Sequence, residues 1–480
     1  MKQKMQNQRR SNMKHIVFLL LCFTTVLAKA QPANTTKPYK LDLDAFIGQL
    51  KQYHPVAKQA GILVEKAEAE LLATRGAFMD PSVTFNTSRK TFDGKSYFIY
   101  NRPEIKLPTL FGADFKAGLE NNGGPRLSSE ESLGRTSYLG VEMPVLRNLL
   151  FDKRRAALQQ ARLFRTQSEQ ERLIVLNNLL LDAYVAYWQW AGTYQLYQNY
   201  TRFLEVSNER FKLVKIAYAN GDRAEIDTIE ALTQVQSFTI LQQEARMKLV
   251  GTSLDVSNFL WMEKDSSYLL PETAIPDTLL FTNLLQIEPV ENFIMRSNAQ
   301  NPMLRTYDFK LQALEVERKL KFQSLLPYVN LKYNLLNQGY YVFKDVNAAF
   351  LENNYKWGLD VKIPLFFREG RGDYRAAKLK ITETRLELNN KRWETENKIR
   401  YYHNEFSQLY KQIITATQAY NNYTKLLRAE ELRFRNGEST LFVLNARENK
   451  VLETTQKLIE LRIKYFKAQY TVQWASGALR

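Results

Sequence analysis

Cysteine and histidine are scarce in this sequence of 480 residues, which has one cysteine and three histidines. Cys22 lies in the N-terminal segment, and only His54 and His403 lie beyond that segment. This excludes Cys/His metal sites and a Cys-His nucleophile from the remainder of the chain. His54 precedes Pro55 at the start of one helical stretch and His403 lies within another, which favours structural roles over a Ser-His-Asp site. We therefore expect no enzymatic activity, catalytic residue, metal site or cofactor.

Long apolar runs are also rare. The apolar run 16–27 follows a basic segment and precedes Ala28-Lys29-Ala30, a small-x-small cleavage site, so residues 1–30 are predicted to be a secretory signal peptide. Cleavage would remove six basic and no acidic residues, which lowers the formal net charge from +17 to +11. No other segment has about 18 uninterrupted apolar residues, so the mature chain should enter a membrane only as a closed barrel of strands. The basic residues are spread along helical faces, which favours anionic lipid over nucleic acid as a partner.

Proline is missing from two long stretches, 145–270 and 365–480, although the chain has fourteen prolines. Because proline inside a helix costs about 3 kcal/mol, both stretches favour uninterrupted helix. Each contains one Asn-Gly pair, Asn220-Gly221 and Asn436-Gly437, which favours a chain reversal, so each stretch is predicted to be a helical hairpin. The first arm, 152–219, would be on the order of 100 Å long, too long to bury its apolar stripe without partner chains. Four aromatic residues at helical spacing are expected to pack between helices: Tyr184, Tyr187, Trp188 and Trp190.

Four segments between the helices alternate apolar and polar residues: 81–88, 138–143, 327–335 and 359–363. This period of two predicts strands with one wet and one apolar face. Four strands are too few to close a barrel, whereas a trimer would supply twelve. The segment between Pro81 and Pro144 has about 26 more residues than its later counterpart. We expect this insertion to form hairpin-like aromatic strands with a Gly-rich tip, as an elaborated loop on the outer face of the barrel.

The same landmarks occur twice in the same order, 216 to 247 positions apart, which indicates two fused copies of one domain-sized unit. His54-Pro55 corresponds to Asn301-Pro302, Pro81 to Pro327, Pro144 to Pro364, and Gly221 to Gly437. We expect a first repeat over 31–280, with strands within 81–146 and a helical hairpin over 150–262, and a second repeat over 281–480, with strands within 327–366 and a helical hairpin over 372–478.

This double series, from about Leu41 to Leu479, resembles the outer membrane efflux protein family, the TolC-like outer membrane factors. The hairpin tips carry most of the resemblance. Residues 221–231 are similar to the family signature Gly-x-x-x-x-(apolar)-Asp-(apolar)-x-x-Ala, and residues 437–446 are similar to a form that is shorter by one residue. Residues 144–156 further resemble a Bacteroidetes-type branch of the family.

The resemblance implies a TolC-like fold that is mainly α with a transmembrane β-barrel contribution. Each chain would have two tandem repeats of helix-strand-strand-long helical hairpin, and a homotrimer would form a twelve-stranded outer-membrane barrel and a periplasmic α-helical tunnel. The resemblance also implies that the hairpin tips, at Asn220, Gly221, Asn436 and Gly437, dock a periplasmic adaptor (membrane fusion) protein of an inner-membrane pump.

An acidic gate would rest on the first tip, because the second tip has Val443 or Leu444 where the family often has Asp. Asp227 and Glu230 would form a ring of six carboxylates around a threefold axis, which favours cations and could bind a blocking multivalent cation. Arg223 could pair with a carboxylate across a subunit contact and hold the tip closed. The same three residues could instead be ordinary solvated charges near a helix start.

The expected function is an outer-membrane exit duct, with a periplasmic extension, for small molecules such as drugs or metal ions. The outer-membrane duct of a type I protein secretion system is an alternative within the family. A secreted coiled-coil scaffold or adhesin is an alternative of a different class, which explains the helices but not the amphipathic strands.

Overall fold

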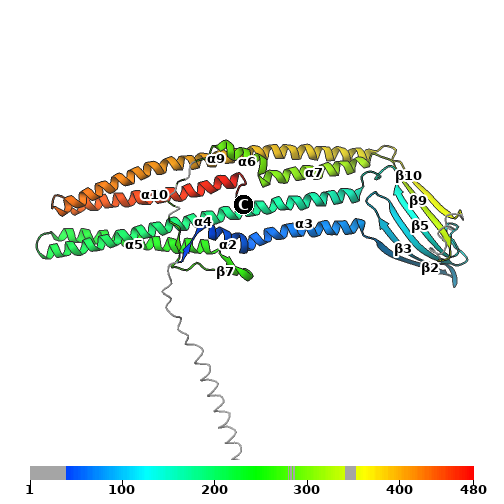
Figure 1. Ribbon diagram of the computed structural model, residues 1–480, viewed down its shortest axis with the longest axis horizontal. Coiled ribbons are helices and arrows are strands. Elements are labelled where there is room, and N and C mark those ends of the chain that lie inside the picture. Colours follow the sequence, from blue (N-terminus) through cyan, green and yellow to red (C-terminus); the bar gives the residue numbers. More distant parts are fainter. Residues whose placement is uncertain (1–38, 279–280, 282–283, 285–286, 341–352) are drawn as a thin grey trace, which may run out of the picture.

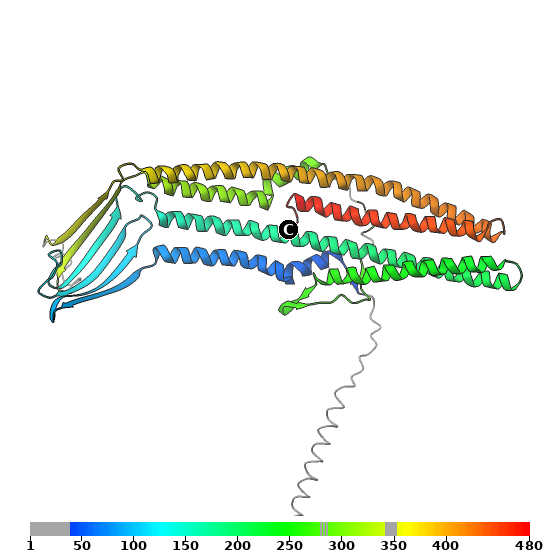
Figure 2. The same ribbon diagram turned by 180° about the vertical axis from the view of Figure 1, so that it is seen from behind.

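The computed structural model describes residues 39–278, 281, 284, 287–340 and 353–480. The signal peptide expected over 1–30 lies outside these residues. The molecule is elongated: a sheet stands at one end, two helical hairpins turn back at the other, and long helices connect the two ends (Figures 1 and 2).

The helices occur in the same order and with similar lengths in both halves of the chain. Helices of 11, 25, 67 and 33 residues in the first half are matched by helices of 11, 22, 68 and 35 residues in the second. This agreement confirms the duplication. Among the described residues, no helix has a stretch long and apolar enough to span a membrane. The helices are α2 (Leu43–Tyr53), α3 (Pro55–Met79), α4 (Lys153–Ala219), α5 (Glu225–Ser257), α6 (Val290–Gln300), α7 (Pro302–Gln323), α9 (Arg368–Arg435) and α10 (Leu441–Ala475).

Both hairpins reverse at the predicted Asn-Gly pair. Asn220 caps α4 and is followed by Gly221 at φ 80°, and Asn436 caps α9 and is followed by Gly437 at φ 76°. Glycine adopts this left-handed conformation without the steric cost that a Cβ atom brings. The two reversals set the common end point of the helices and place both tips at the same end of the molecule (Figure 1).

One antiparallel sheet of six strands has the order β10-β9-β5-β4-β3-β2. The expectation of two strands per repeat is therefore wrong for the first repeat, which supplies four. The turn Asp93-Gly94, with φ of 51° and 70°, permits a two-residue hairpin, so the inserted chain stays in the sheet and does not leave it as a loop. The strands are β2 (Ser82–Phe92), β3 (Lys95–Pro108), β4 (Asp114–Gly123), β5 (Gly134–Pro144), β9 (Tyr328–Gln338) and β10 (Tyr355–Lys362). Two small sheets pair β1 (Lys40–Leu41) with β8 (Ile275–Pro276), and β6 (Trp261–Met262) with β7 (Ser266–Ser267), beside a 3-10 turn at Glu263–Asp265.

The helices form one curved layer with the same two edges along its length. Near the sheet, α3 packs on α4, α4 on α7 and α7 on α9, and near the tips α5 packs on α4, α4 on α10 and α10 on α9. Helices α3 and α5 thus lie along one edge and α9 along the other (Figures 1 and 2). The edge strands of the sheet agree with this order, because β2 follows α3 and β10 precedes α9.

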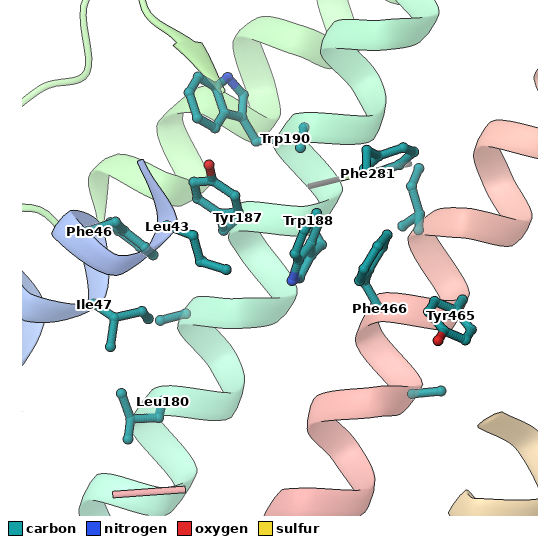
Figure 3. Close-up of a cluster of buried hydrophobic side chains, with 14 of the residues drawn as sticks. Leu43, Phe46, Ile47, Leu180, Tyr187, Trp188, Trp190, Phe281, Tyr465 and Phe466 are labelled. Carbon is teal, nitrogen blue, oxygen red and sulfur yellow. The ribbon is translucent and has the colours of Figure 1, made fainter. Parts of the chain in front are cut away.

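The main core lies halfway along the layer, where α2, α4 and α10 meet (Figure 3). Trp188 stacks on Phe466 with ring centroids 4.0 Å apart. The buried Tyr187 hydroxyl donates a hydrogen bond to the Leu41 carbonyl oxygen at 3.0 Å. Tyr184 stacks on Tyr470 at 3.7 Å. These contacts, with the fully buried Trp190, confirm that the aromatic residues of α4 pack between helices.

The two repeats also match where a short helix meets a longer one. The His54 Nδ1 atom accepts a hydrogen bond from the Val56 N–H at 3.2 Å and caps α3, and the Asn301 Oδ1 atom accepts one from the Met303 N–H at 3.0 Å and caps α7. Burial lowers the pKa of His54, although a backbone hydrogen bond involving Asn258 opposes this shift. His54 therefore has the structural role expected from the sequence.

His403 also has a structural place. Its Nε2 atom lies 2.8 Å from the Glu288 carbonyl oxygen, which joins α9 to the segment before α6. Its ring lies 6.1 Å from that of Phe293. Both histidines beyond the N-terminal segment are thus engaged in packing contacts.

Candidate functional site

One face of the six-stranded sheet is polar and crossed by ion pairs. Residues directly opposite one another in the register share a face, and this face includes Asp114, Glu142 and Lys332 in one row. The Glu142 carboxylate accepts from the Lys116 Nζ atom at 2.6 Å and from the Asn330 Nδ2 atom at 2.8 Å, and so joins β4, β5 and β9. The side chains of the polar face are therefore joined by hydrogen bonds and ion pairs, and this face is suited to contact with water.

The other face of the sheet is apolar and exposed. Because neighbouring strands continue the same alternation, most of the exposed large apolar side chains of the six strands lie on this one face. An apolar patch of this extent marks a protein or membrane contact. Its exposed members are Val83, Phe85, Ile105, Leu107, Phe115, Leu139, Tyr333, Tyr355, Trp357, Leu359 and Val361.

At the opposite end of the molecule, the first tip holds Arg223 and Asp227 close together. The Arg223 Nη1 atom lies 3.9 Å from the Asp227 Oδ2 atom, and both side chains are about a quarter exposed. The Arg223 guanidinium also lies over the Phe434 ring of the second hairpin, 4.6 Å from its centroid. Arg223 therefore joins the two tips of one chain through its stacking contact.

Glu230 lies one turn further along α5 and contacts the second repeat. Its Oε1 atom accepts a hydrogen bond from the Asn445 Nδ2 atom at 3.3 Å, and the Gln234 Nε2 atom donates to the Asn449 Oδ1 atom at 2.8 Å. When the two tips are aligned on the alanine that ends each motif, Glu230 is equivalent to Asn445, and Gln234 to Asn449. Equivalent side chains of α5 and α10 thus meet each other. In the described part of the chain, no cluster of three or more His, Cys, Asp or Glu is placed to hold a metal ion.

A buried ion pair that the sequence analysis missed joins the two hairpins near their tips. The Arg210 guanidinium donates to both carboxylate oxygens of Glu448, at 2.7 and 3.0 Å, and to the Asn445 Oδ1 atom at 3.4 Å. The Glu448 side chain is 2% exposed and that of Arg210 is 12% exposed. A charge in a long polar helix usually faces solvent, so only the packing of α4 on α10 distinguishes this pair. Nothing in the sequence marked it.

A groove of about 400 Å³ lies beside this pair, between the two hairpins. It is open to solvent, and charged side chains of both signs stand along it. Its lining residues are Glu205, Val206, Glu209, Arg210, Leu213, Glu431, Phe434, Arg435 and Leu444.

Comparisons with known proteins agree with this architecture. A family model described as "Outer membrane efflux protein" matches residues 294–478, which lie in the second repeat. The CmeC outer membrane channel of Campylobacter jejuni has 14% identity and a TM-score of 0.61, over 91% of this chain and 86% of that one. The open MtrE outer membrane channel of Neisseria gonorrhoeae has 13% identity and a TM-score of 0.65, over 91% of this chain and 89% of that one. No curated protein matches the sequence significantly.

The fold is thus that of the TolC-like outer-membrane channels, which confirms the expected fold class. The match to the family model covers the second repeat and agrees with the resemblance to the outer membrane efflux protein family found in the sequence. Proteins of this family are outer-membrane channels and not enzymes, in agreement with the function class and location expected from the sequence. The narrower resemblance of residues 144–156 to a Bacteroidetes-type branch has no support from these comparisons.

Proposed function

We propose that this protein is the outer-membrane subunit of a tripartite export system and forms a trimeric exit duct for small molecules such as drugs or metal ions. A periplasmic adaptor and an inner-membrane pump would supply the energy and select the cargo. One observation carries the proposal: a single layer of helices connects a sheet with an exposed apolar face at one end to two hairpin tips at the other. A scaffold or adhesin surrounded by water is not expected to expose an apolar sheet face of this extent, because such a patch marks a protein or membrane contact.

A homotrimer is supported by the two edges of the helical layer. Within one chain, α4 packs on α10. The repeat makes α4 equivalent to α9 and α5 equivalent to α10, so the same contact between chains would join α9 to α5 of the next copy. Both helices expose large apolar side chains, including Ile229 and Met247 on α5 and Leu426 and Leu432 on α9. Three copies would bury these side chains and arrange six similar hairpins around one axis.

The hairpin tips are the proposed site of both the gate and the adaptor. Around a threefold axis, three copies of Asp227 and three of Glu230 would form six carboxylates, which favour cations and could hold a blocking multivalent cation. Arg223 would keep the tips together through its contacts with Asp227 and Phe434. The turns at Asn220-Gly221 and Asn436-Gly437, with the groove beside them, would receive the adaptor.

The proposed assembly can be tested on detergent-extracted outer membranes. We expect the protein to migrate as a heat-resistant trimer and to form pores in planar bilayers. Recovery as a soluble monomer from the periplasm would overturn the proposed function.

The gate can be tested separately with Asp227→Ala in planar bilayers. We expect a lower preference for cations and a weaker block by multivalent cations, because half of the carboxylates of the proposed ring are removed. Asp222→Ala is a matched control, since Asp222 is an exposed carboxylate of the same turn that lies before α5. Equal selectivity and equal block in Asp227→Ala and the unmodified protein would reject the gate and leave the duct intact.

A further inference from the structure

We propose that the inserted β3–β4 hairpin is part of the channel wall, so that three copies close a ring of eighteen strands and not twelve. In this ring, β10 of one copy pairs with β2 of the next. The inference rests on the proposed homotrimer and assigns the edges of the sheet as the surface that receives a second copy of this chain.

The first support is that the hairpin is bonded into the sheet along both of its sides. On one side β3 pairs with β2 over most of its length, and on the other β4 pairs with β5 through nine consecutive residues, from Asp114↔Glu142 to Asn122↔Gly134. A hairpin that folded away as a plug or an external loop would lose both of these ladders and expose its backbone N–H and C=O groups.

The second support is a side chain that spans three strands on the polar face. Tyr138 of β5 lies across Gly118 of β4, and its hydroxyl donates a hydrogen bond to the Glu104 carboxylate of β3 at 2.5 Å. A Cβ atom at Gly118 would lie 2.4 Å from the Tyr138 ring, so the glycine provides the space for this crossing. The inserted hairpin and the strand that follows it are thus fitted to each other.

The third support is a link from the hairpin to the helical layer. Asp114, at the start of β4, is 7% exposed. Its carboxylate accepts two hydrogen bonds from the Arg154 guanidinium of α4, at 2.5 and 2.9 Å, and forms an ion pair with Lys106 of β3 at 2.8 Å. A bidentate arginine contact fixes direction as well as distance, so the base of the hairpin is fixed in position relative to α4, which follows β5.

Both edge strands of the sheet are exposed and can pair with a second copy of the chain. All eleven residues of β2 are exposed, as are seven of the eight in β10. The insertion adds two strands, so the alternation of direction is kept and β10 runs antiparallel to the β2 that would follow it. Both edges carry apolar residues on the same face, including Val83 and Phe85 on β2 and Leu359 and Val361 on β10, so the apolar face would continue without a break. The diameter of such a ring grows roughly with strand number, to about 1.5 times that of a twelve-stranded ring.

Cysteine cross-linking tests the inference, because Cys22 is the chain's only cysteine and lies in the predicted signal peptide. Phe85→Cys would be combined in turn with Trp357→Cys, Leu359→Cys or Val361→Cys and oxidised in the membrane. We expect one or more of these pairs to give covalent dimers and trimers on denaturing gels, because β2 of one chain lies beside β10 of another.

A second set of variants decides whether the hairpin lies in the wall. Ala117→Cys with Leu139→Cys should cross-link β4 to β5 within one chain, as peptide mapping would show, and Val83→Cys with Leu139→Cys should not react. In a twelve-stranded wall, β2 would be next to β5, so a link between positions 83 and 139 and none between 117 and 139 would overturn the inference. Heat-resistant trimers with that result would leave the proposed duct standing, whereas soluble monomers would reject the duct itself.

Discussion

The two repeats of the chain agree in their helices and differ in their strands. Matching helices differ by at most three residues in length, whereas the first repeat has four strands of the sheet and the second has two. Hairpins that stand side by side must reach the same level, so a change in the length of one would misalign the tips. A sheet tolerates extra strands as long as they come in pairs and keep the alternation of direction.

The repeats also differ in the side chains at equivalent positions near the tips. Counted back from the Asn-Gly turn, Arg210 of α4 corresponds to Leu426 of α9. Arg210 forms a buried ion pair within the chain, whereas Leu426 is 45% exposed on the edge that we propose meets the next copy. The contact inside a chain is thus ionic and buried, and the proposed equivalent between chains is apolar.

Breaking the buried pair should have the largest effect. Arg210→Ala leaves the Glu448 carboxylate buried without its main partner, and we expect a loss of about 3–5 kcal/mol. The double variant Arg210→Met with Glu448→Leu removes both charges and should recover most of that loss. Thermal unfolding of the purified protein, followed by circular dichroism, would measure both.

The neighbouring pair Lys212–Glu209 is the matched control for this prediction. It also lies on α4, but its side chains are 67% and 70% exposed. Exposed pairs contribute about 0–1 kcal/mol. If Arg210→Ala lowered the melting temperature no more than Lys212→Ala, the ionic contact between the hairpins would be unimportant for stability.

The second prediction compares the caps of the two repeats. Asn301 caps α7, and its Nδ2 atom also donates to the Ser297 Oγ atom at 3.1 Å and to the Ala475 carbonyl oxygen at 3.4 Å. Asn301→Ala therefore loses a cap and two further hydrogen bonds of a buried side chain, and should cost about 1–2 kcal/mol. His54→Ala should cost less. Asn298→Ala, at an exposed position of α6, is the control, and an equal effect of Asn298→Ala and Asn301→Ala would contradict this role.

Much of the helical part of the fold was predictable from local signals. The stretches without proline, the two Asn-Gly turns and the aromatic spacing of α4 depend on neighbouring residues, and the helices follow them. The strand count was not predicted correctly, because the hairpin-like strands of the inserted segment, which include the turn Asp93-Gly94, were assigned to an outer loop and not to the sheet. Asp227 and Arg223 could be identified as a candidate gate from a tip motif. Arg210 and Glu448 are 238 positions apart and meet only through packing, which no local pattern reports.

The smallest expected effect concerns the difference between His54 and Asn301 as caps. His54→Asn gives the first repeat the cap residue of the second and removes a titratable group. Burial lowers the pKa of His54 in the folded state below its usual value of about 6.5. At a pH between these two pKa values, the unfolded chain binds a proton at His54 and the folded chain does not. This histidine therefore destabilises the fold as the pH falls from about 6.5 towards the lowered pKa. We expect the melting temperature of His54→Asn to fall less between pH 7.5 and pH 5.5 than that of the unmodified protein. Since all other titrating groups are shared, identical decreases in the two proteins would show that His54 does not contribute to the pH dependence.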